Sequence, residues 1–218
     1  MKLPAMLMMV ALANASVFGQ TIVDFFETIP DSSIFGLSKD IRTKIIRHSR
    51  GLKIDSLRDA DTICVKFAKI DTSGLPNGYL KVTGFFEGYI ELRCWNLKNS
   101  KKLIAVYTES CGPVCTMDRF DFYEYNGKSF KPIDRKLVIP DIFADFFVGN
   151  YKEQLVKMEK ADVLVSLLFE LPSKGENIVA KWGNEGSKDV YEAYGKGDRM
   201  DLIWTGKKFS KGRLYWRQ

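Results

Sequence analysis

The feature that most constrains this chain is a change in hydrophobic period near Asp61. After it, apolar and polar residues alternate in short runs separated by glycine or asparagine, a pattern typical of antiparallel strands joined by tight turns. One such turn, Asn126-Gly127, supplies the two positive φ angles that a type I′ hairpin needs. The sequence therefore predicts a meander with strands at Thr62–Ile70, Tyr79–Thr83, Tyr89–Trp95, Leu103–Thr108 and Arg119–Tyr125.

Alternation divides the third predicted strand into two unlike faces. Ile90, Leu92 and Cys94 share an apolar face, whereas Glu91 and Arg93 lie on a polar face with an aromatic fringe. Tyr and Trp are enriched at binding hot spots, so an exposed fringe is a candidate binding surface; a fringe covered by helices is the other interpretation. The candidate residues are Tyr89, Trp95, Tyr107, Tyr123 and Tyr125.

Two helices are expected before the strands. Helical spacing indicates Thr21–Phe26, which Pro30 ends, and Lys39–Ser49, for which Ser38 is the candidate N-cap. The only histidine, His48, falls in the last turn of the second helix, where positive charge complements the helix dipole. No cysteine, aspartate or histidine stands at ligand spacing around it, so we expect neither a metal ligand nor a catalytic base there.

Past Pro140 the period changes twice. Short helices are expected around Ile142–Phe147 and at Tyr151–Lys160, and the long apolar run Ala161–Leu171 then predicts a central strand. Further strands are predicted at Ile178–Trp182, Asp189–Tyr194, Met200–Trp204 and Arg213–Trp216. The expected fold class is α+β, with N-terminal helices packed on antiparallel meander sheets.

The two β stretches resemble each other in sequence. Asp118–Phe122 is matched eighty positions later by Asp198–Leu202. A duplicated β unit and two independent hairpins both explain this similarity. We expect helices and a first β unit over residues 20–137, short helices and a second β unit over 138–218, and one compact domain formed by both.

Residues 1–19 have the pattern of a secretory signal peptide. The apolar run Leu3–Leu12 is shorter than the roughly 20 residues that a membrane-spanning helix needs. Small residues permit cleavage between Gly19 and Gln20, which we favour, or after Ala15. No cysteine follows the run for lipid attachment. We therefore expect an exported, soluble protein without a transmembrane anchor, periplasmic or extracellular.

Composition fits a globular chain. Hydrophobic residues make up 45% of it, which is more than disordered chains contain. The net charge is +6, and removal of Lys2 with the signal peptide leaves +5, a mild excess that attracts anionic surfaces weakly and predicts no nucleic-acid partner.

Four cysteines agree with export, because thiols pair in oxidising compartments. Cys111 and Cys115 are separated by one residue more than in a thioredoxin-like motif and lie between two predicted strands, which favours a structural loop-closing disulfide over a redox-active pair. Cys64 and Cys94 fall in predicted strands, as a cross-strand bridge or as two buried thiols; sequence leaves the connectivity open.

Motifs for catalysis are absent from the sequence. It contains no Gly-x-Gly-x-x-Gly, no Gly-x-x-x-x-Gly-Lys-Ser/Thr phosphate loop and no Gly-x-Ser-x-Gly elbow. The carboxylate pairs Asp118 with Asp121 and Glu87 with Glu91 do not share a strand face in a way that suits glycoside hydrolysis. We therefore predict no catalytic residue, no metal and no cofactor.

The C-terminal segment interleaves cations with aromatic residues. Such a surface suits acidic polysaccharide, lipopolysaccharide headgroups or single-stranded nucleic acid. A terminal hairpin with its aromatics in the core and its cations at the sheet edge, where they block aggregation, also explains the pattern and is the interpretation we favour. The candidate binding residues are Lys207, Lys208, Lys211, Arg213, Trp216 and Arg217.

The run Phe25–Ser32, followed by Leu37, Arg42, Ile45 and Ile46, resembles the opening of a family of exported Bacteroidetes-type bacterial proteins of unknown function. The similarity continues at Gly78–Val82, Ile90–Leu97, Leu103–Val106, Cys111-Gly112-Pro113 and Phe120–Tyr123, and spans roughly two-thirds of the mature chain. The resemblance implies an α+β envelope protein and brings no catalytic residues.

Two functional hypotheses follow. The first is a non-catalytic exported module that binds a protein or glycan of the cell envelope through the aromatic face or the disulfide-closed loop. The alternative is an exported enzyme, either a thiol-disulfide exchanger using Cys111 and Cys115 or a hydrolase that uses carboxylates.

Overall fold

The computed structural model describes residues 20–34, 36–54, 59–98, 100–112, 114–163, 165–183 and 188–217. The expected signal peptide and both of its cleavage sites lie outside these ranges, except that Gln20 is the first described residue. A helix of sufficient length and apolarity to cross a membrane is not found among the described residues.

The two predicted N-terminal helices form with regular caps. The Thr21 side chain accepts a hydrogen bond from the backbone N–H of Asp24, whose carboxylate accepts one from the N–H of Thr21. Ser38 caps the second helix as expected. The helical elements are α1 (Ile22–Thr28), η1 (Asp31–Ser33), α2 (Lys39–Ser49), α3 (Asp59–Phe67), η2 (Leu75–Asn77), α4 (Arg135–Val138), η3 (Phe143–Phe146), α5 (Tyr151–Lys160) and α6 (Lys188–Tyr194).

The prediction of a first strand at Thr62–Ile70 was wrong. Most of it belongs to α3, and only a short strand, β1 (Lys69–Asp71), follows. Asp61, Val65 and Ala68 are buried, a spacing of four and three that matches one face of a helix. Cys64 therefore lies in a helix and not in a strand.

The first sheet is the predicted meander. Its strands are hydrogen-bonded in chain order, each antiparallel to the next. Asn126-Gly127 joins the last two strands, and the edge strand carries Pro132. The strands after β1 are β2 (Tyr79–Thr83), β3 (Gly88–Asn96), β4 (Lys102–Cys111), β5 (Cys115–Tyr125) and β6 (Phe130–Ile133).

The second sheet is antiparallel, in the order β10-β9-β8-β7. Two predictions for this part of the chain were wrong. The expected central strand Ala161–Leu171 contributes only β7 (Leu167–Glu170), at an edge. Asp189–Tyr194 is helical. The prediction failed because a segment this short fits the period of a strand and the period of a helix. In the helix, Tyr191 stacks on Trp182 with ring centroids 4.7 Å apart. The remaining strands are β8 (Ile178–Trp182), β9 (Arg199–Trp204) and β10 (Phe209–Tyr215).

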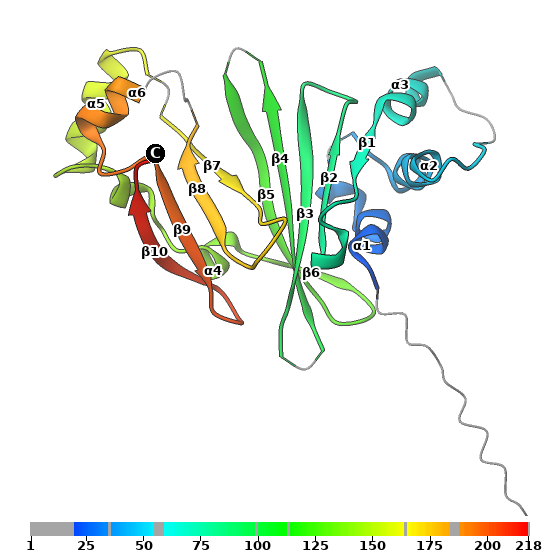
Figure 1. Ribbon diagram of the computed structural model, residues 1–218. Helices are drawn as coiled ribbons and strands as arrows, with labels where there is room; N and C mark the ends of the chain where they lie inside the picture. Colours follow the sequence, from blue (N-terminus) through cyan, green and yellow to red (C-terminus); the bar gives the residue numbers. More distant parts are fainter. Residues whose placement is uncertain are drawn as a thin grey trace, which may run out of the picture.

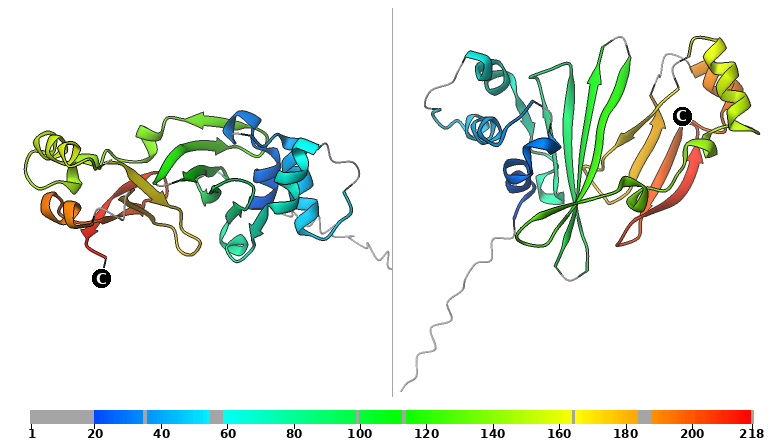
Figure 2. Two further views of the ribbon diagram at one scale, coloured as in Figure 1. Left: turned by 90° about the horizontal axis from the view of Figure 1, so that it is seen from above. Right: turned by 180° about the vertical axis from the view of Figure 1, so that it is seen from behind.

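The elements form layers around two hydrophobic clusters. Helices α1 to α3 lie on the side of the first sheet that faces away from the second sheet, and α5 and α6 lie at the far end of the second sheet (Figures 1 and 2). One cluster joins α1, α2 and α3 to the first sheet, and the other joins the two sheets. Both faces of the first sheet are therefore covered, and the α+β fold class is confirmed.

Candidate functional site

The aromatic fringe is not the exposed surface that the sequence suggested. Trp95 and Tyr107 are 1% and 0% exposed, because the second sheet packs on their face. The Trp95 indole Nε1–H donates to the Glu176 carbonyl at 2.8 Å. Tyr89 is partly buried beside them, 6.2 Å from Tyr107 between ring centroids. These three residues form part of the core between the sheets.

Tyr123 and Tyr125 lie on the opposite face, against α1. Tyr123 pairs with Ile104 across the ladder, and a register shift between Thr108 and Glu109 makes room for an extra residue on β5. The Tyr125 ring meets the Phe25 ring edge-on at 5.1 Å. The five predicted aromatics are thus divided between two buried faces and do not form one surface.

Buried carboxylates occupy the face that meets the second sheet. Glu91 accepts hydrogen bonds from the Tyr79 hydroxyl at 2.8 Å and from Lys81 at 3.1 Å, and its second oxygen accepts from the backbone N–H of Leu171 at 3.4 Å. Burial raises the pKa of Glu91, while the charge of Lys81 and the hydrogen bonds oppose the rise. The network ties β3 to the chain around β7.

Glu109 is the second acid of this face. Its Oε2 accepts from the hydroxyls of Tyr89 and Tyr107 at 2.7 and 2.8 Å. Burial and the neighbouring carboxylates raise the pKa of both tyrosines, so the hydroxyls stay protonated and donate. The Tyr107 oxygen in turn accepts from the N–H of Phe169 at 3.3 Å. Each acid is 5% exposed or less, so these groups link the two sheets from within the core.

Cys111 and Cys115 form a disulfide with Cα atoms 4.0 Å apart, directly opposite each other at the end of the β4–β5 hairpin. Cys111 ends a strand, so it lacks the helix N-terminus that lowers the pKa of a redox-active thiol. The donor atoms of Glu109 and the two sulfurs lie within 4.8 Å of one another, but sulfurs joined in a disulfide are not thiolate ligands.

The other two cysteines, Cys64 and Cys94, carry free thiols. Burial raises the pKa of Cys94 to about 11, so this thiol stays protonated and inert at neutral pH. The cross-strand bridge, one of the two interpretations of this pair, is absent. Cys64 lies on α3 and lines a pocket.

This pocket, of 590 Å³, lies between α3, the β2–β3 turn and the helix-side face of β3 to β5. Its volume falls within the usual range for ligand sites. The Phe85 and Phe86 rings, 4.7 Å apart, belong to the β2–β3 turn. The lining residues are Gly36, Cys64, Phe85, Phe86, Ile90, Thr108, Ser110, Asp118 and Arg119.

A glycine brings the aromatic turn close to α3. Gly84 has φ +92, and a Cβ at this position would lie 2.2 Å from the Phe67 carbonyl oxygen, which no side chain tolerates. The close approach places Phe85 and Phe86 beside Cys64 and forms one wall of the pocket.

Two polar side chains, those of Thr108 and Arg119, lie among the apolar residues that line the pocket. Thr108 is 7% exposed, and its hydroxyl has no hydrogen-bond partner among the described residues. A buried hydroxyl without a partner is unfavourable, and a polar group bound in the pocket would supply the missing one. Arg119 donates to the Ser32 carbonyl and lies 3.6 Å from Asp121.

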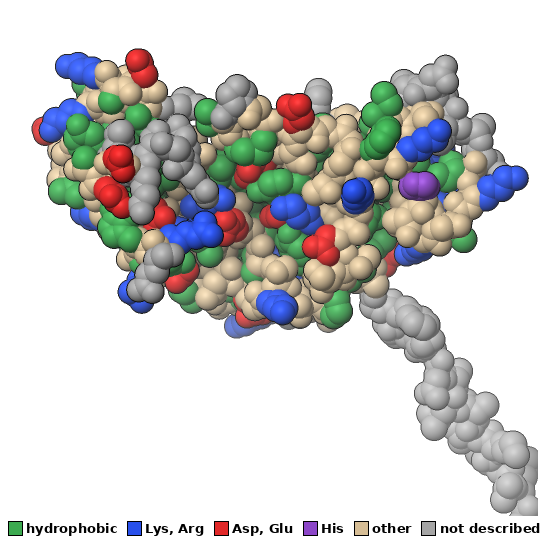
Figure 3. Space-filling model, turned by 45° about the horizontal axis from the view of Figure 1, so that its top comes forward, with side chains coloured by type: hydrophobic (Ala, Val, Ile, Leu, Met, Phe, Trp, Pro, Cys, Tyr) green, Lys and Arg blue, Asp and Glu red, His purple; other side chains and the backbone are tan. Residues whose placement is uncertain are grey.

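Two exposed apolar side chains lie on α3, the helix whose Cys64 lines the pocket. Ile63 and Phe67 are 59% and 60% exposed. Figure 3, with the top of the molecule tilted forward, shows hydrophobic side chains at the surface toward the upper right, the end of the molecule where α3 lies. Together Ile63, Phe67 and the pocket form what we call the α3 patch. Sequence reasoning missed it, although the Phe-Phe pair inside a glycine-bounded turn was a visible signal.

The C-terminal candidate residues are distributed over several environments. Lys211 forms an ion pair with Asp145 at 2.5 Å, and the Arg213 guanidinium lies 5.8 Å from the Tyr215 ring centroid. Trp216 packs against the core between the sheets, and the backbone N–H of Arg217 donates to Asp198. Lys207 and Lys208 occupy the exposed β9–β10 turn.

The fold and these surfaces define a two-sheet α+β protein with an apolar pocket. A model of a family of proteins of unknown function (DUF3256) matches residues 14–171, so the chain belongs to this family. The resemblance to a family of unknown function is confirmed to this extent.

Comparison with solved structures finds a domain of an uncharacterized protein from Porphyromonas gingivalis W83. It is 14% identical, with a TM-score of 0.57 over 88% of this chain and 97% of that chain, and shows that the fold is shared. No curated protein matches the chain.

Proposed function

We propose that this protein is an exported, non-catalytic module that binds a protein of the cell envelope through the α3 patch. The observation that carries the proposal is the buried Thr108 hydroxyl, which has no hydrogen-bond partner among the described residues, in a pocket lined by Phe85 and Phe86. The pocket accepts an apolar side chain, and Thr108 hydrogen-bonds a polar group beside it.

A protein partner fits better than a glycan at this site. Ile63 and Phe67 extend the apolar surface beyond the pocket, and contiguous exposed apolar residues mark protein–protein contacts. The disulfide between Cys111 and Cys115 supports export, because such bonds persist in oxidising compartments.

The test is photo-crosslinking in the native host with a benzophenone amino acid at Phe86, followed by mass spectrometry. A protein crosslinked through Phe86, but not through the same probe at Val156 on α5, is then purified for titration. N-terminal sequencing of the mature protein tests export and is expected to begin at Gln20.

Two substitutions sharpen the titration. Phe67→Ser removes exposed apolar area and is expected to weaken binding about tenfold or more. Thr108→Val is expected to weaken it about fivefold, whereas Val156→Ser, at a similarly exposed apolar position, leaves it unchanged. Equal binding by all variants, or crosslinks independent of probe position, would contradict the proposal.

A further inference from the structure

A second cleft lies at the opposite end of the first sheet. The cleft has a volume of 590 Å³ and is lined by the β9–β10 turn, by the chain at either end of the β3–β4 turn, and by β6 and α4. The two turns are about a hundred residues apart in the sequence. Its lining residues are Leu97, Lys98, Lys101, Leu103, Glu124, Ile133, Leu137, Val138, Thr205, Gly206, Lys207 and Lys208.

The charge of this cleft is strongly unbalanced. Four of its lining residues are lysines and one is a glutamate. Lys101 is neutralised by Glu124 at 2.8 Å. Lys98, Lys207 and Lys208 form no ion pair with any residue that the structure describes. Three cations that lack an ion-pair partner in the described part of the chain therefore line one concavity, which lowers the free energy of a bound anion.

The turn that carries two of these lysines has a defined conformation. The Thr205 hydroxyl donates to the Lys208 carbonyl at 2.6 Å, and the Thr205 N–H donates to the same oxygen at 3.0 Å. Gly206 has φ +84, which a side chain rarely adopts. The backbone of this turn is thus fixed before a ligand arrives, which reduces the entropy lost on binding.

The floor of the cleft is apolar. Leu103 and Val138 are buried beneath it, and Leu137 is 70% exposed at its edge. Sugar rings present apolar C–H faces and carry their charge on substituents at the ring edge, so they match a floor of leucines under a rim of lysines. The concave shape favours such a ligand over a planar membrane surface.

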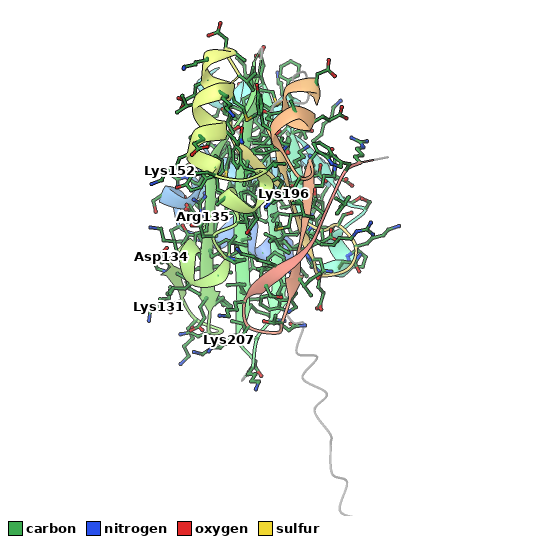
Figure 4. The ribbon with its side chains drawn as sticks, turned by 90° about the vertical axis from the view of Figure 1, so that its left-hand side faces the viewer. Lys131, Asp134, Arg135, Lys152, Lys196 and Lys207 are labelled. Atoms are coloured by element: carbon green, nitrogen blue, oxygen red, sulfur yellow. A yellow bond between two sulfur atoms is a disulfide. The ribbon has the colours of Figure 1, made fainter. Side chains whose placement is uncertain are left out.

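Further positive charge lies beside the cleft. In the side view of Figure 4, Lys207 lies at the lower end, with Lys131 and Arg135 above it, interrupted by Asp134. A chain longer than the cleft thus meets more cations along this side.

We propose that this cleft, the lysine cleft, binds an anionic oligosaccharide of an envelope glycan, with carboxylate or phosphate substituents on Lys98, Lys207 and Lys208. The proposal is independent of the α3 patch, because none of the described residues lines both pockets.

The test uses the purified full exported protein and tetragalacturonate as an anionic probe, with maltotetraose as its neutral counterpart. Calorimetric titration at low salt is expected to show binding of tetragalacturonate that weakens as salt rises, and none of maltotetraose. Lys98→Gln with Lys207→Gln and Lys208→Gln is expected to reduce affinity about tenfold. These side chains are on the surface, so the unfolding midpoint serves as the check of folding.

The matched control removes three charges elsewhere. Lys152→Gln with Lys157→Gln and Lys160→Gln on α5 lowers the net charge equally and is expected to change affinity less than about twofold. Equal losses in both triple variants would overturn the proposal in favour of non-specific charge attraction. Phe67→Ser is expected to leave the titration unchanged, which separates this site from the α3 patch.

Two more measurements constrain the ligand class. Leu137→Ala is expected to weaken tetragalacturonate binding about threefold without altering the salt dependence, because it removes apolar surface at the edge of the cleft. Vesicles of phosphatidylcholine with a quarter phosphatidylglycerol form the other arm. Vesicle binding that needs the three lysines, without binding of tetragalacturonate, would replace the oligosaccharide by a membrane and overturn the proposal.

Discussion

The two faces of the first sheet differ in what holds them to their neighbours, although alternate residues of the same strands build both. The helix-side face carries Leu92, Ile104 and Val106, all completely buried. The face toward the second sheet also packs in an apolar cluster, but it carries in addition Glu91 and Glu109 with their tyrosine and lysine partners. Apolar burial is non-directional, whereas hydrogen bonds require defined geometry, so the second face specifies how the two sheets sit together.

The largest expected effect is on the helix-side face. Phe26→Ala removes a ring of α1 that is completely buried, and it is expected to lower the free energy of unfolding by about 3 to 5 kcal/mol. Because no titrating group is involved, the loss should be the same at every pH. Urea denaturation between pH 4 and 8 measures it; a loss that varied strongly with pH would break the contrast between the faces.

The next effect is on the opposite face. Glu91→Leu leaves Lys81, the Tyr79 hydroxyl and the Leu171 N–H without their acceptor, and is expected to lower the free energy of unfolding by about 3 kcal/mol. The comparison is Glu91→Gln, which keeps shape and one acceptor and should lose less. Equal stability of wild type and Glu91→Leu would show that the network is dispensable.

The pH dependence of Glu91 sharpens this result. Its folded-state pKa is raised above 4.5, so the folded protein binds the proton more tightly than the unfolded chain. The stabilisation linked to this proton is complete below pH 4.5 and is lost as pH rises through the folded-state pKa. The stability of wild type relative to Glu91→Gln should therefore fall over this interval, and an increase would contradict the assignment.

The disulfide at the end of the β4–β5 hairpin is expected to contribute to the stability of the protein. Cys111→Ser with Cys115→Ser is expected to cost about 2 kcal/mol, because the unfolded chain regains the entropy of a short closed loop. Thermal unfolding with and without reductant measures this. Reductant should destabilise the wild type equally and leave the double variant unaffected.

The smallest effects are expected for the hydroxyls of Tyr107 and Thr108, neighbours on β4 that lie on opposite faces of the sheet. Tyr107→Phe deprives Glu109 of a donor and the Phe169 N–H of an acceptor, and is expected to cost about 1 to 2 kcal/mol. Thr108→Val removes a hydroxyl without a partner among the described residues and is expected to leave stability unchanged or higher. A large loss with Thr108→Val would show that its hydroxyl already has a partner.

The meander was predictable because its register depends on local signals. Strands β2 and β8 have the predicted bounds, since alternation and glycine turns define both. Helices α3 and α6 were missed because short segments fit two periods at once. For Ala161–Leu171, apolarity indicated burial correctly at Leu168 and Phe169, but it does not indicate strand length or position in a sheet.

The candidate sites were less predictable than the fold. Tyr107 and Tyr123 were assigned to one surface because alternation orders residues within a strand, not between strands, and the extra residue on β5 changes the pairing. The lysine cleft joins Lys98 to Lys207, which only the packing of the two sheets brings together. The charge pattern of the C-terminal segment pointed to two of the three lysines of the proposed site, Lys207 and Lys208.

The edge strand β6 also limits how this protein associates with others. It is four residues long, and Pro132 offers no N–H at its centre, while Lys131 places a charge beside it. A strand from another chain therefore cannot extend the sheet at this edge, which protects the hairpin against fibril-like growth. Partners recognised on this side of the molecule must be recognised through side chains and not through main-chain pairing.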